Sequence, residues 1–189
     1  MTFKLATSVL VIGVFLAGAS FSTMAIFTDS DSIDANSFTA GTVDLTTNPT
    51  TQLVLDPDMA PGDEVTNPVT VTNAGTLDLR YAITSTTTED TFAAVLQLTI
   101  KTGVTACTNG GFDTDGTVIY GPALVGTIAG TDIIGEPAQG AQSDERTLVS
   151  LANEVLCFNV ELPIGTGNSS QGDSTTATLV FASEQTINN

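Results

Sequence analysis

The chain contains 189 residues, and 21 Asp and Glu residues against 4 Lys and Arg residues give it a net charge of −17 at pH 7. An acidic surface of this kind repels nucleic-acid phosphates and anionic lipid headgroups, so we expect no nucleic-acid partner. Histidine is absent, which excludes a Ser-His-Asp triad and a HExxH zinc site. Hydrophobic residues make up 41% of the chain and fall in ordered patterns, which excludes a disordered acidic chain.

Residues 1–25 have the three parts of a secretory signal peptide. Lys4 provides the sparse positive start, Leu5–Ala19 forms the apolar segment, and small residues up to Ala25 suit a signal peptidase. We therefore expect a secreted protein that meets the membrane only before cleavage. The alternative is an uncleaved anchor, because the apolar run up to Phe27 is just long enough to span a bilayer.

The next segment, residues 26–38, is unusually apolar for the start of a mature chain, which is normally frayed and hydrophilic. Its large apolar side chains are Ile26, Phe27, Ile33 and Phe38. One explanation is that Phe38, Val43 and Leu45 begin the first strand of the chain's own domain, with Gly41 as a bulge. We expect Ala40–Leu45 to be such a strand in any case, because apolar and polar residues alternate there.

Alternation of apolar and polar residues with a period of two continues along the chain and predicts β-strands. Two alternating runs flank the turn residues Asn73-Ala74-Gly75, which predicts a β-hairpin. Further strands are predicted at 96–101, 156–162 and 177–181. The side chains predicted to face the core are Val65, Val69, Val71, Leu77, Leu79, Tyr81, Ile83, Leu96, Leu98, Ile100, Leu156, Phe158, Val160, Leu162, Ala177, Leu179 and Phe181.

Proline and glycine separate these runs, and short strands between such breaks predict one all-β domain, an antiparallel β-sandwich over residues 39–189. Helix is scarce, and we expect one or two short helices. Glu89–Leu98 favours a short helix with Thr88 as its cap. Ser143–Asn153 suits a second helix, or equally a strand or an irregular loop.

Two cysteines, Cys107 and Cys157, follow the signal. In an oxidising compartment such a pair usually forms a disulfide. Cys157 lies on the strand face opposite to Leu156 and Phe158, so we expect the disulfide to lie outside the main core and to pin the loop around Cys107. A metal site at these cysteines is disfavoured, because the chain lacks histidine and a CxxC motif.

Two groups of acidic residues are weak candidates for calcium, which prefers hard oxygen ligands. The first group is Asp29, Asp31 and Asp34, and the second is Asp113 and Asp115. Neither group continues to the bidentate glutamate of an EF-hand, and a tight turn suits Asp113–Gly116 better. We therefore expect no cofactor, with calcium as the alternative.

The stretch Asn168-Ser169-Ser170 is a sequon for N-glycosylation. It lies among glycine and serine residues, so we expect Asn168 to be exposed. Whether Asn168 is modified depends on the producing organism.

No set of catalytic residues emerges from the sequence. Paired carboxylates are compatible with glycoside hydrolysis, but clefts for sugars normally add aromatic platforms. Aromatic residues make up only 6% of this chain, and tryptophan is absent. We therefore expect no enzymatic activity.

After the signal come five stretches in this order: "FTDSDSIDANSFTAGTVDL", "APGDEVTNPVTVTNAGTLDLRYAIT", "FAAVLQLTI", "LCFNVELP" and "TTATLVFASEQTINN". Together they resemble the TasA/camelysin (CalY) family of exported proteins, in the branch that a SipW-type signal peptidase processes. The resemblance implies a jelly-roll β-sandwich that builds extracellular filaments of biofilm matrix, similar in design to archaeal bundling pili. It also implies donor-strand exchange, in which residues 26–38 of one copy complete the sheet of the next copy.

The partners implied by this resemblance are copies of the chain itself in a homopolymer, together with the signal peptidase. An inserted strand gains main-chain hydrogen bonds from its neighbour and buries its side chains. At 1.5–3 kcal/mol each, the four apolar side chains of residues 26–38 would contribute about 6–12 kcal/mol before ordering entropy is subtracted. A head-to-tail contact of this kind propagates as a filament.

Two other functions are alternatives to a filament subunit. Some members of the family are described as metalloendopeptidases, but without histidine a zinc ion would need carboxylates or cysteines alone. The other function is a monomeric binding module displayed at the cell surface, for example for glycans. A chelator-sensitive cleavage assay and the association state of the mature chain would separate the three.

Overall fold

The computed structural model describes residues 37–51, 53, 56 and 58–187. The chain divides into two units, Met1–Thr39 and Ala40–Asn189, and all the strands described below belong to the second. The predicted signal peptide and most of the predicted donor segment, including Ile26, Phe27 and Ile33, lie outside the described residues. Within the described part of the chain, no helix is long and apolar enough to cross a membrane.

The larger sheet contains five antiparallel strands, in the order β1, β2, β8, β4, β5. These strands are β1 (Leu45–Asn48), β2 (Glu64–Asn73), β8 (Asn153–Glu161), β4 (Gln97–Thr102) and β5 (Thr117–Leu124). The longest pairing within this sheet joins β2 to β8 over nine residues of each strand. The predicted strands at 96–101 and 156–162 are therefore confirmed as β4 and β8.

The smaller sheet is built around β3 (Leu79–Thr87). On one side, β9 (Ala177–Gln185) pairs with β3 along its whole length. On the other side, β7 (Arg146–Leu148) and β6 (Thr131–Ile134) pair with successive halves of β3. The segment at Ser143–Asn153 is therefore a loop with a short strand, and not the helix that was the third alternative.

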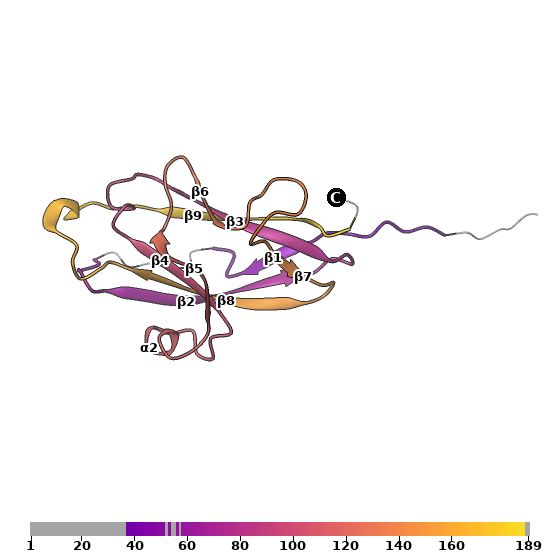
Figure 1. Ribbon diagram of the computed structural model, residues 1–189, viewed down its shortest axis with the longest axis horizontal. Coiled ribbons are helices and arrows are strands. Elements are labelled where there is room, and N and C mark those ends of the chain that lie inside the picture. The colour runs from indigo at the N-terminus through magenta and orange to yellow at the C-terminus, as the bar shows by residue number, and fades with distance from the viewer. Residues whose placement is uncertain (1–36, 52, 54–55, 57, 188–189) are drawn as a thin grey trace, which may run out of the picture. The chain divides into compact units, whose positions relative to one another are not determined.

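The two sheets pack face to face and enclose the hydrophobic core, which is the predicted all-β sandwich (Figure 1). Figure 1 shows β3, β6 and β9 in one layer and β2 and β8 in the other. The core side chains follow the predicted alternation, because successive residues of a strand point to opposite faces. The fully buried ones include Val71, Leu79, Tyr81, Ile83, Ile100, Leu156 and Phe158.

The predicted hairpin is wrong. β2 and β3 lie in different sheets, and the turn at Asn73 carries the chain from one layer to the other. Asn73 is fully buried, and its side-chain amide donates hydrogen bonds to the carbonyls of Leu77 (2.8 Å) and Leu148 (3.1 Å). Its side-chain oxygen accepts one from Gly75 N (3.0 Å). Alternation shows which side chains face the core, but not which sheet a strand joins.

The predicted helix at Glu89–Leu98 is also wrong. Residues 91–95 form an isolated turn, and β4 begins at Gln97. The Glu89 carboxylate, not Thr88, caps this turn by accepting hydrogen bonds from the backbone N–H groups of Thr91, Phe92 and Ala93. These bonds hold the pKa of Glu89 below its ordinary value. Thr88 instead pairs with Thr176 just before β9.

The first strand begins later than predicted, at Leu45 in place of Ala40. Residues 42–44 instead run alongside the connection between β2 and β3. Isolated hydrogen bonds join the two segments, such as Thr76 N to Thr42 O (3.0 Å) and Ala74 N to Asp44 O (2.7 Å). Gly41 is not a strand bulge. It lies against Leu77, and a side chain at this position would overlap Leu77 Cδ2.

Candidate functional site

An apolar groove of about 450 Å³ opens on the surface of the described part of the domain. Strand β4, the end of β8, the beginning of β9, the turn before β4 and the segment before β2 line the groove. Its floor reaches the core, because Leu98 and Phe158 line it although their exposed fractions are only 1% and 0%. Its other apolar lining residues include Leu53, Met59, Phe92 and Leu179.

The groove runs beside a strand edge that has no partner among the described residues. β9 pairs with β3 along one edge, and the described residues offer no strand to its other edge. Natural edge strands usually carry lysine, proline or a bulge that blocks pairing with another chain. The nine residues of β9, Ala-Thr-Leu-Val-Phe-Ala-Ser-Glu-Gln, contain none of these residue types and pair with β3 without a bulge. This edge is therefore open to an added strand.

Two buried hydroxyl groups lie next to this region. The Oγ of Ser85 and the Oγ1 of Thr87 have no hydrogen-bond partner within the described part of the chain. On β3, Ser85 is paired with Leu179 and Thr87 with Ala177, the two β9 residues that line the groove. Buried hydroxyls are normally satisfied, so these two groups are exceptions at this end of the core.

A second pocket, of about 830 Å³, continues from the groove around the loop before β9. The two share Asp56, Met59, Phe92 and Thr175. The sequon residue Asn168 lines this pocket within the short 3-10 helix η2 (Asn168–Ser170), where it is exposed as expected.

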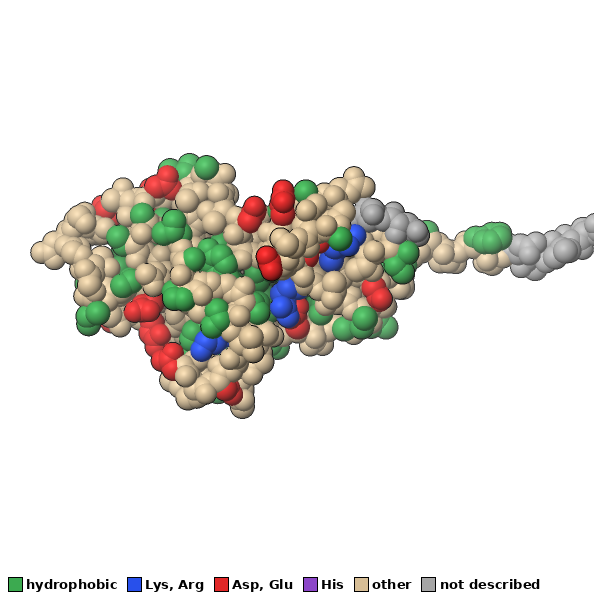
Figure 2. Space-filling view, viewed as in Figure 1, with side chains coloured by type: hydrophobic (Ala, Val, Ile, Leu, Met, Phe, Trp, Pro, Cys, Tyr) green, Lys and Arg blue, Asp and Glu red, His purple; other side chains and the backbone are tan. Residues whose placement is uncertain are grey.

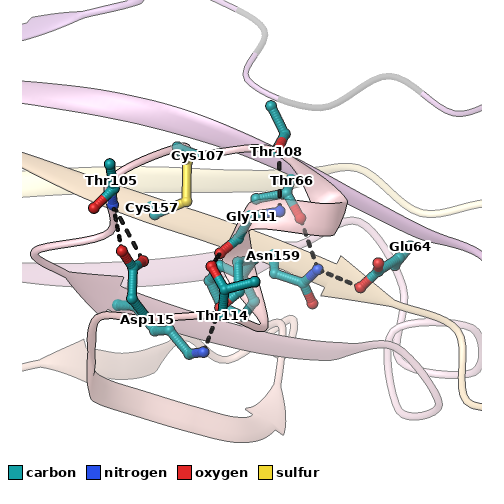
Figure 3. Close-up of a disulfide and its surroundings, with 12 residues drawn as sticks. Glu64, Thr66, Thr105, Cys107, Thr108, Gly111, Thr114, Asp115, Cys157 and Asn159 are labelled. Carbon is teal, nitrogen blue, oxygen red and sulfur yellow. Dashed lines mark hydrogen bonds between the residues drawn. A yellow bond between two sulfur atoms is a disulfide. The ribbon is translucent and has the colours of Figure 1, made fainter.

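The disulfide joins Cys107 to Cys157 on the outer face of the larger sheet (Figure 3). Cys157 is only 1% exposed but points away from the main core, which is the predicted arrangement. The loop that it holds contains α2 (Asn109–Phe112), which lies on the outer side of β2 and β8. Beneath α2, Asn159 donates hydrogen bonds to Glu64 (2.7 Å) and Thr66 (2.8 Å).

The second group of calcium candidates lies in the same loop and forms a turn. Asp113 ends α2, and Gly116 has a φ of +85°. Both carboxylate oxygens of Asp115 accept hydrogen bonds from Thr105 N, at 3.1 and 3.3 Å. Hydrogen bonds from Thr105 hold the pKa of Asp115 below its ordinary value. The Asp115 carboxylate therefore closes the loop. The first group, Asp29, Asp31 and Asp34, lies outside the described residues.

A charged cluster lies where Tyr81 reaches the edge of the core. The hydroxyl of Tyr81 donates a hydrogen bond to Glu154 Oε1 (2.7 Å), and the guanidinium of Arg146 pairs with both carboxylate oxygens of Glu154. Burial raises the pKa of Tyr81 far above its ordinary value, and the adjacent Glu154 charge raises it further. Hydrogen bonding to Glu154 likewise raises the pKa of Arg146. This cluster crosses between the sheets and is structural.

The other two basic residues of the domain also have partners within it. Arg80 pairs with Glu184 (2.5 Å) and Glu145 (3.7 Å). Lys101 lies over the ring of Phe112 and donates a hydrogen bond to its carbonyl. Figure 2 shows few basic side chains on an otherwise acidic and neutral face.

The predicted site residues are thus widely distributed. The disulfide is confirmed, and of the predicted donor residues only Phe38 is described, at 95% exposed. The sequence analysis missed the groove. Its lining residues Leu53, Met59 and Phe92 lie between strands, where alternation carries no information, although large apolar side chains in loops were a usable signal.

Fold and site together define an all-β sandwich with an open strand edge beside an apolar groove. The family model described as "Camelysin metallo-endopeptidase" matches residues 1–95, half of the chain. The chain belongs to the camelysin family, as the sequence resemblance implied.

Comparison with solved structures yields only distant similarity. The ASH/PapD-like domain 7 of human CEP192 is 15% identical, with a TM-score of 0.28, and the match covers 85% of this chain and 96% of that domain. The sporulation control protein Spo0M from Bacillus subtilis is 15% identical, with a TM-score of 0.26, covering 78% of this chain and 47% of Spo0M. No curated protein sequence matches the chain significantly.

Proposed function

We propose that this protein is a secreted structural subunit of an extracellular filament, assembled head to tail by donor-strand exchange. In the proposed filament, residues 26–38 of one copy enter the apolar groove of the next copy and pair with the free edge of β9. The observation that carries the proposal is a groove open to the core beside an edge of β9 to which the described residues offer no strand. An added strand would provide backbone hydrogen bonds to the edge of β9. Its alternate side chains would at the same time fill the apolar groove.

The lengths of the two segments are compatible. A strand rises about 3.3 Å per residue, so the nine residues of β9 span about 30 Å. The thirteen residues from Ile26 to Phe38 can therefore pair along the whole edge. The apolar side chains of this segment would cover Leu98 and Phe158.

The groove and the start of the domain lie at opposite ends of the sandwich, which favours a filament. The chain enters the domain beside the end of β9, because Leu79 pairs with Gln185 and the connection preceding Leu79 contacts residues 42–44. The groove lies at the other end of the strand, around Ala177. A donor at one end and an acceptor at the other form a heterologous contact, which propagates along one axis.

A metallo-endopeptidase is the second candidate, because the matching family carries that description. The residues present do not fit a zinc centre of the usual kind. Histidine is absent from the sequence, and both cysteines are joined in the disulfide. Among the described residues, no three Asp, Glu, Cys or His side chains are grouped to hold a metal ion. A chelator-sensitive cleavage assay on purified protein tests this candidate.

The filament proposal is tested by shortening the mature chain. A chain that begins at Ala40 should fold, because every described strand begins at or after Leu45, but it should form no filaments in negative-stain electron microscopy. Changing both Phe27 and Phe38 to Asp should have the same effect. Val118→Asp is the matched control, because Val118 is exposed on β5, away from the groove, and should not affect assembly. Filaments formed by the shortened chain would contradict donor-strand exchange.

A further inference from the structure

We propose that copies of this chain meet through a second surface, at the end of the domain where the chain enters it. This surface, the proximal surface, is formed by the exposed side chains of Val43, Val149, Leu151 and Ile187. Its partner is the opposite, groove-bearing end of the neighbouring copy. The proposal rests on the filament function proposed above and adds a contact between the bodies of the domains.

The four apolar side chains come from segments that hydrogen bonds hold together. Ser150 N donates to Asp78 Oδ1 (2.8 Å), and Ser150 Oγ donates to Gly75 O (2.9 Å). Thr186 N also donates to a residue of this connection, Asp78 O (3.1 Å), and Ala74 N donates to Asp44 O (2.7 Å). The segments that carry Val43, Val149, Leu151 and Ile187 therefore meet at one end of the sandwich. Figure 2 shows exposed hydrophobic side chains at the right-hand end of the domain.

Leu151 is the most informative member of the surface. Its backbone has a φ of +62°, a left-handed conformation that residues other than glycine, asparagine and aspartate rarely adopt. Its side chain is also 75% exposed. An exposed leucine in a left-handed turn is unfavourable in an isolated domain on both counts. Burial against a partner removes the exposure and accounts for an apolar residue at this position.

The identity of the partner follows from the length of the tether. Thr42 is fixed to the domain, because its N–H donates to Thr76 Oγ1 (2.9 Å) and its carbonyl accepts from Thr76 N (3.0 Å). Only three residues separate Phe38 from Thr42, and an extended chain spans at most about 3.6 Å per residue, or roughly 14 Å here. A copy that holds Phe38 in its groove must therefore place its groove-bearing end close to Thr42 and the proximal surface.

The groove-bearing end offers a matching apolar surface. Ile128 and Ile164 are 58% and 83% exposed there. Ile128 is anchored by its N–H to Asp90 (2.8 Å) in the turn before β4, and Ile164 packs beside Gly62. The three basic residues of the described chain are engaged within their own domain. Ion pairs therefore do not supply the attraction between the two ends, and apolar contact does.

The test compares the critical concentration, the subunit concentration left in solution beside filaments, for three variants of the chain that begins at Ile26. Leu151→Asn should raise it by about tenfold or more, because burying a leucine side chain accounts for roughly that factor. Asparagine tolerates a positive φ, so the melting temperature of the monomer should not fall. Ile164→Thr should raise the critical concentration in the same direction. Val118→Thr, an exposed apolar residue on β5, is the matched control and should leave it unchanged.

The outcomes separate this inference from the filament proposal. If wild-type chains form filaments and the chain beginning at Ala40 does not, but Leu151→Asn and Ile164→Thr assemble at the wild-type critical concentration, the second surface is overturned and the filament proposal stands. If wild-type chains form no filaments, both are overturned. Amide hydrogen exchange gives an independent readout, since the amides of residues 149–152 should exchange more slowly in wild-type filaments than in the monomer. Unchanged exchange in filaments would also overturn the second surface.

Discussion

At the scale of single residues, the charged groups at the edge of the core are held in a hydrogen-bonded cluster. Tyr81 is fully buried, yet its hydroxyl reaches Glu154, whose charge is in turn held by Arg146. Hydrogen bonds to charged groups are stronger than neutral ones, and a buried charge that loses its partner is costly. The cluster joins β3 of the smaller sheet to β8 of the larger one, so it fixes the two layers against each other.

Tyr81→Phe should lower the free energy of unfolding by about 1–2 kcal/mol at pH 7, because it removes one hydrogen bond to a carboxylate. The wild-type advantage should shrink above about pH 10. There the tyrosine of the unfolded chain ionises, whereas the pKa of Tyr81 in the folded chain is raised by burial, so the unfolded state alone releases the proton. Urea denaturation of both chains from pH 8 to pH 11 measures the difference. A difference in the free energy of unfolding between the two chains that stays constant from pH 8 to pH 11 would contradict the raised pKa of Tyr81.

At the scale of elements, the sequence predicted the faces of the strands well and their partners poorly. The alternation around Leu98, Tyr81 and Phe158 correctly identified core positions, because a half-buried strand must alternate. The same pattern is compatible with a hairpin or with a crossing between sheets. Three hydrogen bonds of the Asn73 side chain decide in favour of the crossing, and their partners include Leu148, which is distant in sequence.

The disulfide was predictable for a simpler reason. A chain with two cysteines has one possible pairing within it, and the position of Cys157 between Leu156 and Phe158 determined the face. The helix at Glu89–Leu98 failed because Glu89 caps an isolated turn and the following residues, from Gln97, pair with β8. Tertiary pairing outweighs a local helical preference of this size.

Replacing Cys107 and Cys157 together by alanine should lower the free energy of unfolding by about 3–4 kcal/mol, because the bond closes a loop of about 50 residues in the unfolded chain. Filaments should still form at protein concentrations and temperatures where the variant is folded. The disulfide lies on the outer face of the larger sheet, whereas the groove opens on the inner face. Chemical denaturation and negative-stain microscopy of the same preparation give the two readouts. Loss of filaments from a folded variant would show that the α2 loop takes part in assembly.

At the scale of the whole molecule, the proposed filament depends on where in the domain the groove lies and where the chain enters. The groove lies at one end of the sandwich and the chain enters the domain at the other, so the proposed contact joins two different surfaces of neighbouring copies and is able to propagate. The net charge of −17 disfavours non-specific association, since like-charged copies repel. Assembly therefore requires a specific contact strong enough to overcome this repulsion, and an inserted apolar strand of thirteen residues has that capacity.

The most direct test of this account is the structure of the filament by electron cryo-microscopy. It should show a strand from residues 26–38 of one copy paired with the free edge of β9 in the next copy, with apolar side chains over Leu98 and Phe158. A groove filled by the copy's own residues 26–38, or a filament in which the edge of β9 stays unpaired, would contradict it.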